Sequence, residues 1–189
     1  METLQYLEQY RQVRTLKSGM RVLFRPLNPD DAEALVALLA SATPEDSLYM
    51  RNDPTDRELI MSWARDVDLL KVFPLIAQVN DRIVGDATLH FGTGYRRHLA
   101  SLRIYLAPEF RRLGIGSLML QNLVAIVRRL GLQQLIAEVL SPQVQVMKAL
   151  EALGFQREYR HRDYFMTAHG ETVDMDVFVL RLVEPGEQF

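Results

Sequence analysis

Hydrophobic and polar positions divide the 189 residues of the chain into short strands and helices. The elements expected before residue 70 are a short amphipathic helix within residues 1–16, a strand at 20–27, a helix from Asn28 to about Ala42 and a second helix after Thr55. Asn28 is expected to cap its helix, because a proline and two acids follow it. Ile60, Trp63 and Ala64 are expected on the inward face of the second helix.

The pattern after residue 70 combines alternating strands with two apolar helices. The elements expected there are a hairpin of strands at 73–79 and 82–91, a strand at 99–107, a helix at 114–130, a strand at 133–140, a helix at 142–153 and two C-terminal strands. Gly131 and Gly154 stand where the two helices are expected to end. This order predicts an α/β fold: a mixed, mainly antiparallel sheet flanked by helices, with one parallel crossover through the helix at 114–130.

No internal repeat or long linker divides the chain, and its length suits one well-cored domain. We therefore expect an N-terminal extension at residues 1–18, one domain at 19–182 and a short tail at 183–189.

Composition excludes several classes of function. The net charge of -2 does not favour nucleic acid or an anionic membrane as a partner, and the absence of cysteine excludes thiolate chemistry. The four histidines lack metal-ligand spacing, so no metal is expected. The longest uncharged segment, residues 113–127, is too short and too polar to span a bilayer, and the N-terminus does not resemble a signal peptide. A cytoplasmic protein is the simplest expectation.

The segment "PEFRRLGIGSLML" (108–120) combines two arginines and two glycines at the expected start of a helix. The N–H groups of a first helical turn bind anions, and glycine lets a phosphate approach them closely. A Walker loop would need a lysine after Gly116, and a dinucleotide-binding loop would need a glycine at Met119. The pattern that fits is Arg-x-x-Gly-x-Gly, formed by Arg111, Gly114 and Gly116.

These residues resemble the Gcn5-related N-acetyltransferase (GNAT) superfamily. "IYLAPEFRRLGIGSLML" is similar to its acyl-CoA pyrophosphate motif, and "AEVLSPQVQVMKALEALGF" (137–155) is similar to its next motif. The opening segment "RPLNPDDAEALVALLASATPEDSLYMR" resembles the acetyltransferase domains of bacterial protein-lysine acetyltransferases. The resemblance covers roughly residues 19–182.

The resemblance implies how acetyl-CoA would be bound as the acyl donor. The backbone of Ile104 to Leu106 would bind the pantetheine arm, and the sheet would splay apart at this end to admit the acyl group. The pyrophosphate would be held by the loop and first helical turn, namely Arg111, Arg112, Leu113, Gly114, Ile115, Gly116 and Ser117. Gln143 would reach the cofactor with its side-chain amide.

The resemblance identifies the catalytic groups less completely than the cofactor site. Glu138 is the candidate general base, because apolar neighbours would raise the pKa of its carboxyl; the alternative is a structural ion pair, for example with Arg103. The family often has Asn at Gln143, the acid Tyr at Leu150 and Glu at Ser101. The proton for the leaving thiolate would then come from water or from another tyrosine, with Tyr105, Tyr159 and Tyr164 as candidates.

The function expected from these observations is acyl transfer from acetyl-CoA to a primary amine, which is either a protein lysine or a small molecule. The alternative is a non-catalytic acyl-CoA-binding sensor or scaffold, which the residues at Leu150 and Ser101 favour. The basic segment "REYRHRDY" (157–164) is interpreted as a solvated strand. A homodimer remains open.

Overall fold

The computed structural model describes residues 2–167 and 169–182, and it divides the chain into two compact units. The first unit contains residues 1–89 and 104–119, and the second contains residues 90–103 and 120–189. The chain passes from one unit to the other within β4, β5 and α5, so each unit is described by itself. The predicted domain boundaries at residues 18 and 182 remain a prediction.

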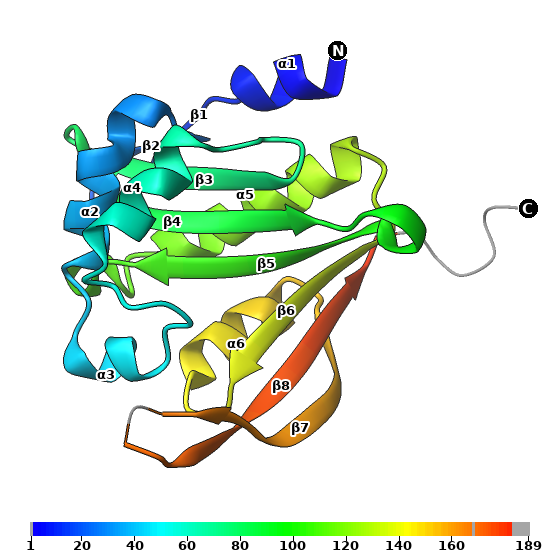
Figure 1. The fold of residues 1–189 in the computed structure, drawn as a ribbon. Coiled ribbons are helices and arrows are strands. Elements are labelled where there is room, and N and C mark those ends of the chain that lie inside the picture. Colours follow the sequence, from blue (N-terminus) through cyan, green and yellow to red (C-terminus); the bar gives the residue numbers. More distant parts are fainter. Residues whose placement is uncertain (1, 168, 183–189) are drawn as a thin grey trace, which may run out of the picture. The chain divides into compact units, whose positions relative to one another are not determined.

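The first unit contains the N-terminal helices and strands (Figure 1). Its elements are α1 (Glu2–Glu8), β1 (Gln12–Thr15), β2 (Arg21–Pro26), the 3-10 helix η1 (Pro29–Asp31), α2 (Ala32–Leu39), α3 (Pro44–Leu48), α4 (Arg57–Arg65), β3 (Val72–Val79), most of β4 (Arg82–Phe91), the end of β5 (Leu99–Leu106), the 3-10 helix η3 (Pro108–Phe110) and the start of α5 (Ile115–Arg129). The second unit adds the 3-10 helix η2 (Gly94–Arg96), β6 (Gln134–Leu140), α6 (Val144–Ala152), β7 (Gln156–Met166) and β8 (Thr172–Arg181).

Eight strands are hydrogen-bonded in the order β1-β2-β3-β4-β5-β6-β8-β7. The pairs β1–β2, β2–β3, β6–β8 and β7–β8 are antiparallel, whereas β5 and β6 are parallel. The parallel register runs from Leu99 opposite Gln134 to Leu102 opposite Ala137. The predicted mixed, mainly antiparallel sheet with a crossover through α5 is therefore confirmed.

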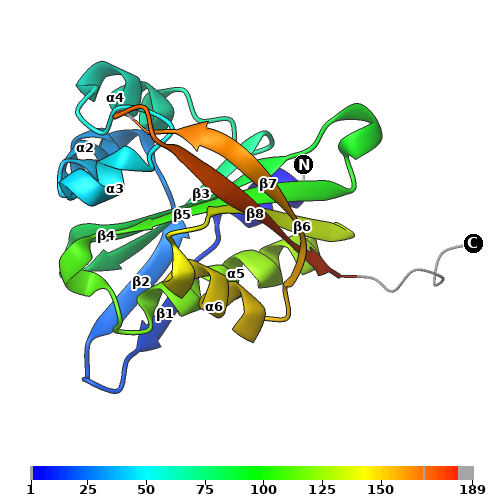
Figure 2. The same cartoon turned by 90° about the horizontal axis from the view of Figure 1, so that it is seen from below.

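The core of the first unit lies between its strands and α2 and α4. Leu35 and Leu38 of α2, Ile60 of α4, Ile76 of β3 and Ala107 after β5 belong to one buried cluster. The start of α5 packs on the opposite face of the strands, where Gly85 lies against Met119 (Figure 2). Each strand can cover both faces because successive side chains point to opposite sides.

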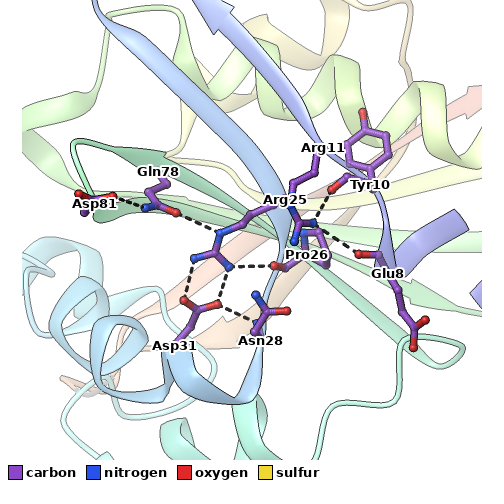
Figure 3. A network of polar contacts seen from close by, with 9 residues as sticks. All are labelled: Glu8, Tyr10, Arg11, Arg25, Pro26, Asn28, Asp31, Gln78 and Asp81. Carbon is purple, nitrogen blue, oxygen red and sulfur yellow. Dashed lines mark hydrogen bonds and ion pairs between the residues drawn. The ribbon is translucent and has the colours of Figure 1, made fainter. Parts of the chain in front are cut away.

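An arginine on β2 fixes the start of α2. Arg25 donates from Nη1 to Asp31 Oδ2 (2.6 Å) and from Nη2 to Asp31 Oδ1 (2.8 Å), and its Nε donates to Gln78 Oε1 (3.0 Å) on β3 (Figure 3). The backbone N–H of Asn28 also donates to Asp31 Oδ2 (2.8 Å). Burial acts to raise the pKa of Asp31, but the hydrogen bonds from Arg25 and Asn28 outweigh it and lower the pKa. The predicted helix start at Asn28 is confirmed by this capping arrangement.

The second unit is built on β6 and β8. Leu135, Ala137 and Val139 of β6 are buried, and Leu150 of α6 is completely buried. The exposed strand β7 is attached to β8 through Arg160, whose Nε and Nη2 donate to the two oxygens of buried Asp176 at 2.9 Å and 2.8 Å. Arg160 holds the pKa of Asp176 below its usual value.

One strand and one α-helix were not predicted, and one side chain was placed wrongly. Strand β1 lies within residues 1–16, where only a short amphipathic helix was expected, and α3 is a five-residue helix between two predicted helices. Trp63 was expected to face inward but is 37% exposed, whereas Ile60 and Ala64 are buried as expected. The buried face of the nine-residue helix α4 is a narrow stripe that contains Ile60 and Ala64, and Trp63 lies at its border. Within the described residues, no helix is both long and apolar enough to cross a membrane.

Candidate functional site

The loop between β5 and α5 has an unusual backbone. After η3, Arg111 is extended, Arg112 has φ 60° and Gly114 has φ 89°, and α5 begins at Ile115. A left-handed conformation is unfavourable for a non-glycine residue and typically costs about 1 kcal/mol or more. Such conformations within a turn direct successive N–H groups into one concave surface, which is a common binding site for anions.

Most backbone N–H groups of this loop have no acceptor among the described residues. Arg111 N–H still bonds to the carbonyl of Pro108 and Leu118 N–H to that of Gly114, but no described residue accepts a backbone hydrogen bond from residues 112–117. The first N–H groups of any helix have no partner in the helix itself. Here the turn before the helix adds further N–H groups, so the loop can surround an anion with several donors.

Neither the backbone conformation nor the packing of the protein requires a glycine at position 116, in the first turn of α5. Its φ is not in the left-handed region, and a Cβ atom built on it would meet only Ile104 Cδ1 at 3.9 Å, an ordinary contact. Gly114 differs, because its positive φ favours glycine although nothing lies within 4 Å of its Cβ position. The space above Gly116 is therefore open in the protein, and a side chain there would fill the concave surface.

The side chain of Arg111 is engaged within the protein. Its Nε donates to the carbonyl of Leu106 (2.9 Å), its Nη2 donates to Asp46 Oδ2 of α3 (2.7 Å), and its guanidinium lies 5.7 Å from the ring centre of Tyr105. Burial acts to raise the pKa of Asp46, but hydrogen bonds from Arg111 and Thr43 outweigh it and lower the pKa. Arg111 was predicted to bind the phosphate, whereas its charge is here paired with Asp46.

The other predicted loop residues contribute in different ways. Arg112 and Ser117 are exposed, and no described residue forms an ion pair with Arg112. Leu113 is exposed, whereas the side chain of Ile115 is completely buried, so only the backbone of Ile115 can face a ligand. The exposed cation, the hydroxyl and the N–H groups together suit a phosphate group.

The end of β5 carries an unpaired backbone edge. Ala107 N–H donates to the carbonyl of Val84 on β4 (2.9 Å), so Tyr105 and Ala107 direct their backbone groups at β4. Ile104 and Leu106 direct theirs to the other edge, and the register of β5 with β6 does not extend to them. This is the segment predicted to bind an extended ligand arm, and its backbone groups are available for it, apart from the Leu106 carbonyl that accepts from Arg111.

The predicted residues of the second unit lie in less distinctive surroundings. Glu138 is exposed on β6, so the apolar environment on which its role as a base was predicted does not surround its side chain. Gln143 is exposed at the start of α6, and its Oε1 accepts from the N–H of Leu140 (3.2 Å). Leu150 is a core residue. The predicted roles of Glu138 and Gln143 remain predictions.

A carboxyl that the sequence analysis did not identify lies in the first unit. Asp86 on β4 has a buried Oδ1 that makes no hydrogen bond to any described residue, and burial raises the pKa of Asp86 to about 7. The buried hydroxyl of Tyr105 makes no hydrogen bond of good geometry to these residues either. Burial raises the pKa of Tyr105, and Ser41 and Arg111 lie near enough to its hydroxyl to offset part of that rise. The hydroxyl of Ser41 donates to the Leu38 carbonyl (2.6 Å). An acid after a glycine in a strand gives no signal of burial in a sequence.

Comparisons with known proteins agree with this geometry. The structure is similar to that of an N-acetyltransferase from Staphylococcus aureus Mu50 (TM-score 0.76, 17% identity), covering 86% of this chain and 99% of that one. It is also similar to yncA, a putative acetyltransferase from Salmonella typhimurium solved with its cofactor acetyl-CoA (TM-score 0.74, 20% identity, 87% and 96% covered). A third similar structure is the GNAT domain of PAT from S. lividans (TM-score 0.73, 18% identity, 90% of this chain and 97% of that one covered).

At these identities the structural similarity shows the fold. A search of curated protein sequences gave no significant match. Residues 33–155, more than half of the sequence, match the profile of the acetyltransferase (GNAT) family. The chain therefore belongs to this family of N-acetyltransferases, which use acetyl-CoA as the acyl donor.

Proposed function

We propose that the chain transfers an acetyl group from acetyl-CoA to a primary amine, and that the loop of residues 111–117 binds the pyrophosphate of the donor. The observation that carries the proposal is Gly116, which is neither left-handed nor closely packed but leaves a concave surface open. A glycine in a helix costs about 1 kcal/mol relative to alanine, so its presence needs a reason outside the packing of the chain. The N–H groups of residues 112–117 around it supply that reason.

The residues of the loop would divide the work of binding. The N–H groups of residues 112–117 would hold the phosphate oxygens, and exposed Arg112 would add a positive charge. Arg111 would hold the loop in position and would not contact the phosphate, because its hydrogen bonds to Asp46 and to the Leu106 carbonyl attach the loop to α3 and β5. The unpaired backbone of Ile104 and Leu106 would bind the pantetheine arm.

Acetyl-CoA supplies an acetyl group activated as a thioester. The chain has to bind and orient it, take a proton from the ammonium group of the acceptor and allow the leaving thiolate to be protonated. The acceptor is proposed to be a primary amine, either a small molecule or a protein lysine. The opening segment of the sequence, which resembles the acetyltransferase domains of bacterial protein-lysine acetyltransferases, supports the lysine.

Coenzyme binding and turnover test the proposal separately. A ligand at a hundred times its Kd stabilises a native protein by about 2.7 kcal/mol, so coenzyme A should raise the melting temperature, whereas ATP and NAD should raise it little. Equal shifts with ATP would identify a general phosphate site. Acetyl-CoA should then release free thiol with a panel of amines that includes lysine peptides, polyamines and amino acids.

The same assay decides between the enzyme and the alternative of a non-catalytic module. Coenzyme binding without thiol release on any amine would favour a sensor or scaffold. Amine-dependent thiol release, with one acetylated product for each thiol, would exclude it.

A further inference from the structure

Asp86 and Tyr105 occupy directly opposite positions on β4 and β5. The backbone bond from Ala107 to Val84 pairs these two residues, and the bond from Gly92 to Leu99 gives the same register at the other end of the two strands. Antiparallel strands run in opposite directions, so the next such pair is found two residues after Val84 on β4 and two residues before Ala107 on β5. These residues are Asp86 and Tyr105. Side chains at directly opposite positions lie on one face with their Cβ atoms roughly 5 Å apart.

This face is the one opposite α5. The Cβ position of Gly85 points at Leu106 and Met119, so the next residue, Asp86, points to the other side of the sheet. Tyr105, between Ile104 and Leu106, points there too and contacts the α2–α4 core cluster. Both residues are partly exposed, whereas the atoms Asp86 Oδ1 and Tyr105 Oη are buried, so a ligand would have to reach these atoms past the exposed parts of the two side chains.

Each residue of the pair has one buried oxygen with no hydrogen-bond partner in the described part of the chain. Most buried polar atoms in folded proteins have a hydrogen-bond partner, because an unpaired one costs about 1–3 kcal/mol. Asp86 Oδ1 and Tyr105 Oη are the buried side-chain atoms that have none among the described residues. A carboxylate oxygen accepts hydrogen bonds and a hydroxyl accepts or donates them, so these two groups on one face suit a ligand that carries N–H donors.

We propose that Asp86 and Tyr105 bind the ammonium group of the acceptor and that Asp86 takes its proton. This inference rests on the proposed acetyltransferase function and assigns the base to the first unit. The position of the pair supports this assignment. Tyr105 lies on the segment of β5 proposed to bind the pantetheine arm, and the ring of Tyr105 is contacted by Arg111 of the loop at residues 111–117.

The proton balance of the step is complete with these groups. The ammonium group gives one proton to the Asp86 carboxylate, and the freed nitrogen lone pair forms the bond to the acetyl carbon while the carbon–sulfur bond breaks. The sulfur leaves with the bonding pair and receives the second proton that the nitrogen loses on becoming an amide. Asp86 then returns its proton to water, so one proton is released for each amide formed.

The groups around Asp86 bear on its titration. Tyr105 faces it from β5, the guanidinium of Arg111 lies 5.7 Å from the ring centre of Tyr105, and Asp46 of α3 is paired with Arg111. Arg103 lies on the same face of β5 as Tyr105. Burial is the cause of the raised pKa of Asp86, so the pKa should persist when Asp46 or Arg111 is replaced.

The test uses the full chain as wild type, Asp86→Asn, Tyr105→Phe and the control Asp30→Asn, in which an exposed acid of η1 undergoes the same change. Asp86→Asn should lower kcat/KM for the amine ~100-fold or more and leave the Kd of coenzyme A within about twofold. Tyr105→Phe should mainly raise KM for the amine. Asp30→Asn should match wild type.

A second readout needs no acetyl-CoA. Without ligand, the melting temperature of wild type should fall relative to that of Asp86→Asn as the pH rises from 4 to 7, while Asp30→Asn should follow wild type. If wild type acetylates an amine and Asp86→Asn does so equally well, the assignment to Asp86 is wrong and the proposed function stands. If wild type acetylates no amine, the proposed function and the assignment of the base to Asp86 are both wrong. A folded Asp86→Asn whose stability shows the wild-type pH dependence would also overturn the assignment.

Discussion

Replacing Gly116 by alanine should move stability and coenzyme affinity in opposite directions. In the protein alone the new methyl group meets only Ile104 Cδ1 at 3.9 Å, which requires no rearrangement. Alanine is favoured over glycine in a helix by about 0.5–1 kcal/mol, and the first turn should give the lower part of that range. For a chain of this size, about 0.5 kcal/mol corresponds to a rise in melting temperature of roughly 1–2 °C.

The same methyl group should weaken coenzyme binding, because it stands where a phosphate would approach the N–H groups. A hydrogen bond to a charged group contributes about 1.5–3 kcal/mol. The loss of one such bond corresponds to a roughly 10- to 100-fold increase in Kd. Gly116→Val should have a larger effect on binding, since its branched side chain fills more of the concave surface.

Gly114→Ala provides the matched comparison, two residues earlier in the same loop. Its φ of 89° is unfavourable for alanine, so this variant should lose about 1 kcal/mol of stability or more. Urea unfolding and titration calorimetry with coenzyme A on both variants test the reasoning. A Gly116→Ala protein that is more stable and binds coenzyme A as tightly as wild type would refute the placement of the pyrophosphate at this turn.

Three further substitutions test other parts of the structure. Arg111→Ala should lower the free energy of unfolding by about 1 kcal/mol, because its partly exposed bridge to Asp46 is lost, with only a moderate effect on coenzyme Kd; unfolding and calorimetry measure both. The folded-state pKa of Asp86, about 7 against an ordinary 3.8, destabilises the chain progressively from about pH 4 to pH 7. The full shift corresponds to about 4 kcal/mol; partial exposure reduces the expected gain of Asp86→Asn at pH 7 to roughly 2 kcal/mol, measurable by urea unfolding at several pH values. Glu138→Gln separates the two candidate bases: with Asp86 as the base, turnover should stay near the wild-type value and any effect should be a lower melting temperature, whereas a ~10²- to 10⁴-fold fall in kcat/KM would identify Glu138 as the base.

Local sequence was enough to predict most elements of the fold. The hairpin of β3 and β4, the crossover through α5 and the strands β7 and β8 have periodicities that neighbouring residues define. The family and its acetyl-CoA chemistry were predicted from the two motifs and are confirmed by the match at residues 33–155. Strand β1 was missed because four residues, mostly exposed, give no alternation to detect; their strand conformation comes from pairing with β2.

The partners of side chains were much harder to predict than the elements. Arg111 occupies the expected position in the motif, but its ion pair is with Asp46, 65 residues away in sequence. Glu138 has apolar neighbours in sequence and yet an exposed side chain, because strand neighbours point to the opposite face. In both cases the chemistry of the group depends on contacts that no short stretch of sequence contains.

Asp86 is a third group whose surroundings could not be predicted from the sequence, and it changes the assignment of the catalytic base. The proton-handling positions expected from the family are a leucine in the core and a serine, and the candidate base on β6 is exposed. The first unit, by contrast, places on one face of the sheet a carboxyl and a hydroxyl whose buried oxygens have no hydrogen-bond partner in the part of the chain that the structure describes, at a cost in stability that packing alone does not explain. The strand segment that carries Tyr105 also leads into the phosphate loop, and Arg111 contacts that ring, the strand carbonyl and α3 at once. A donor held by the loop and an amine held by Asp86 would thus be positioned by one strand, so the loss of either Gly116 or Asp86 should impair transfer through a different step, binding in the first case and proton removal in the second.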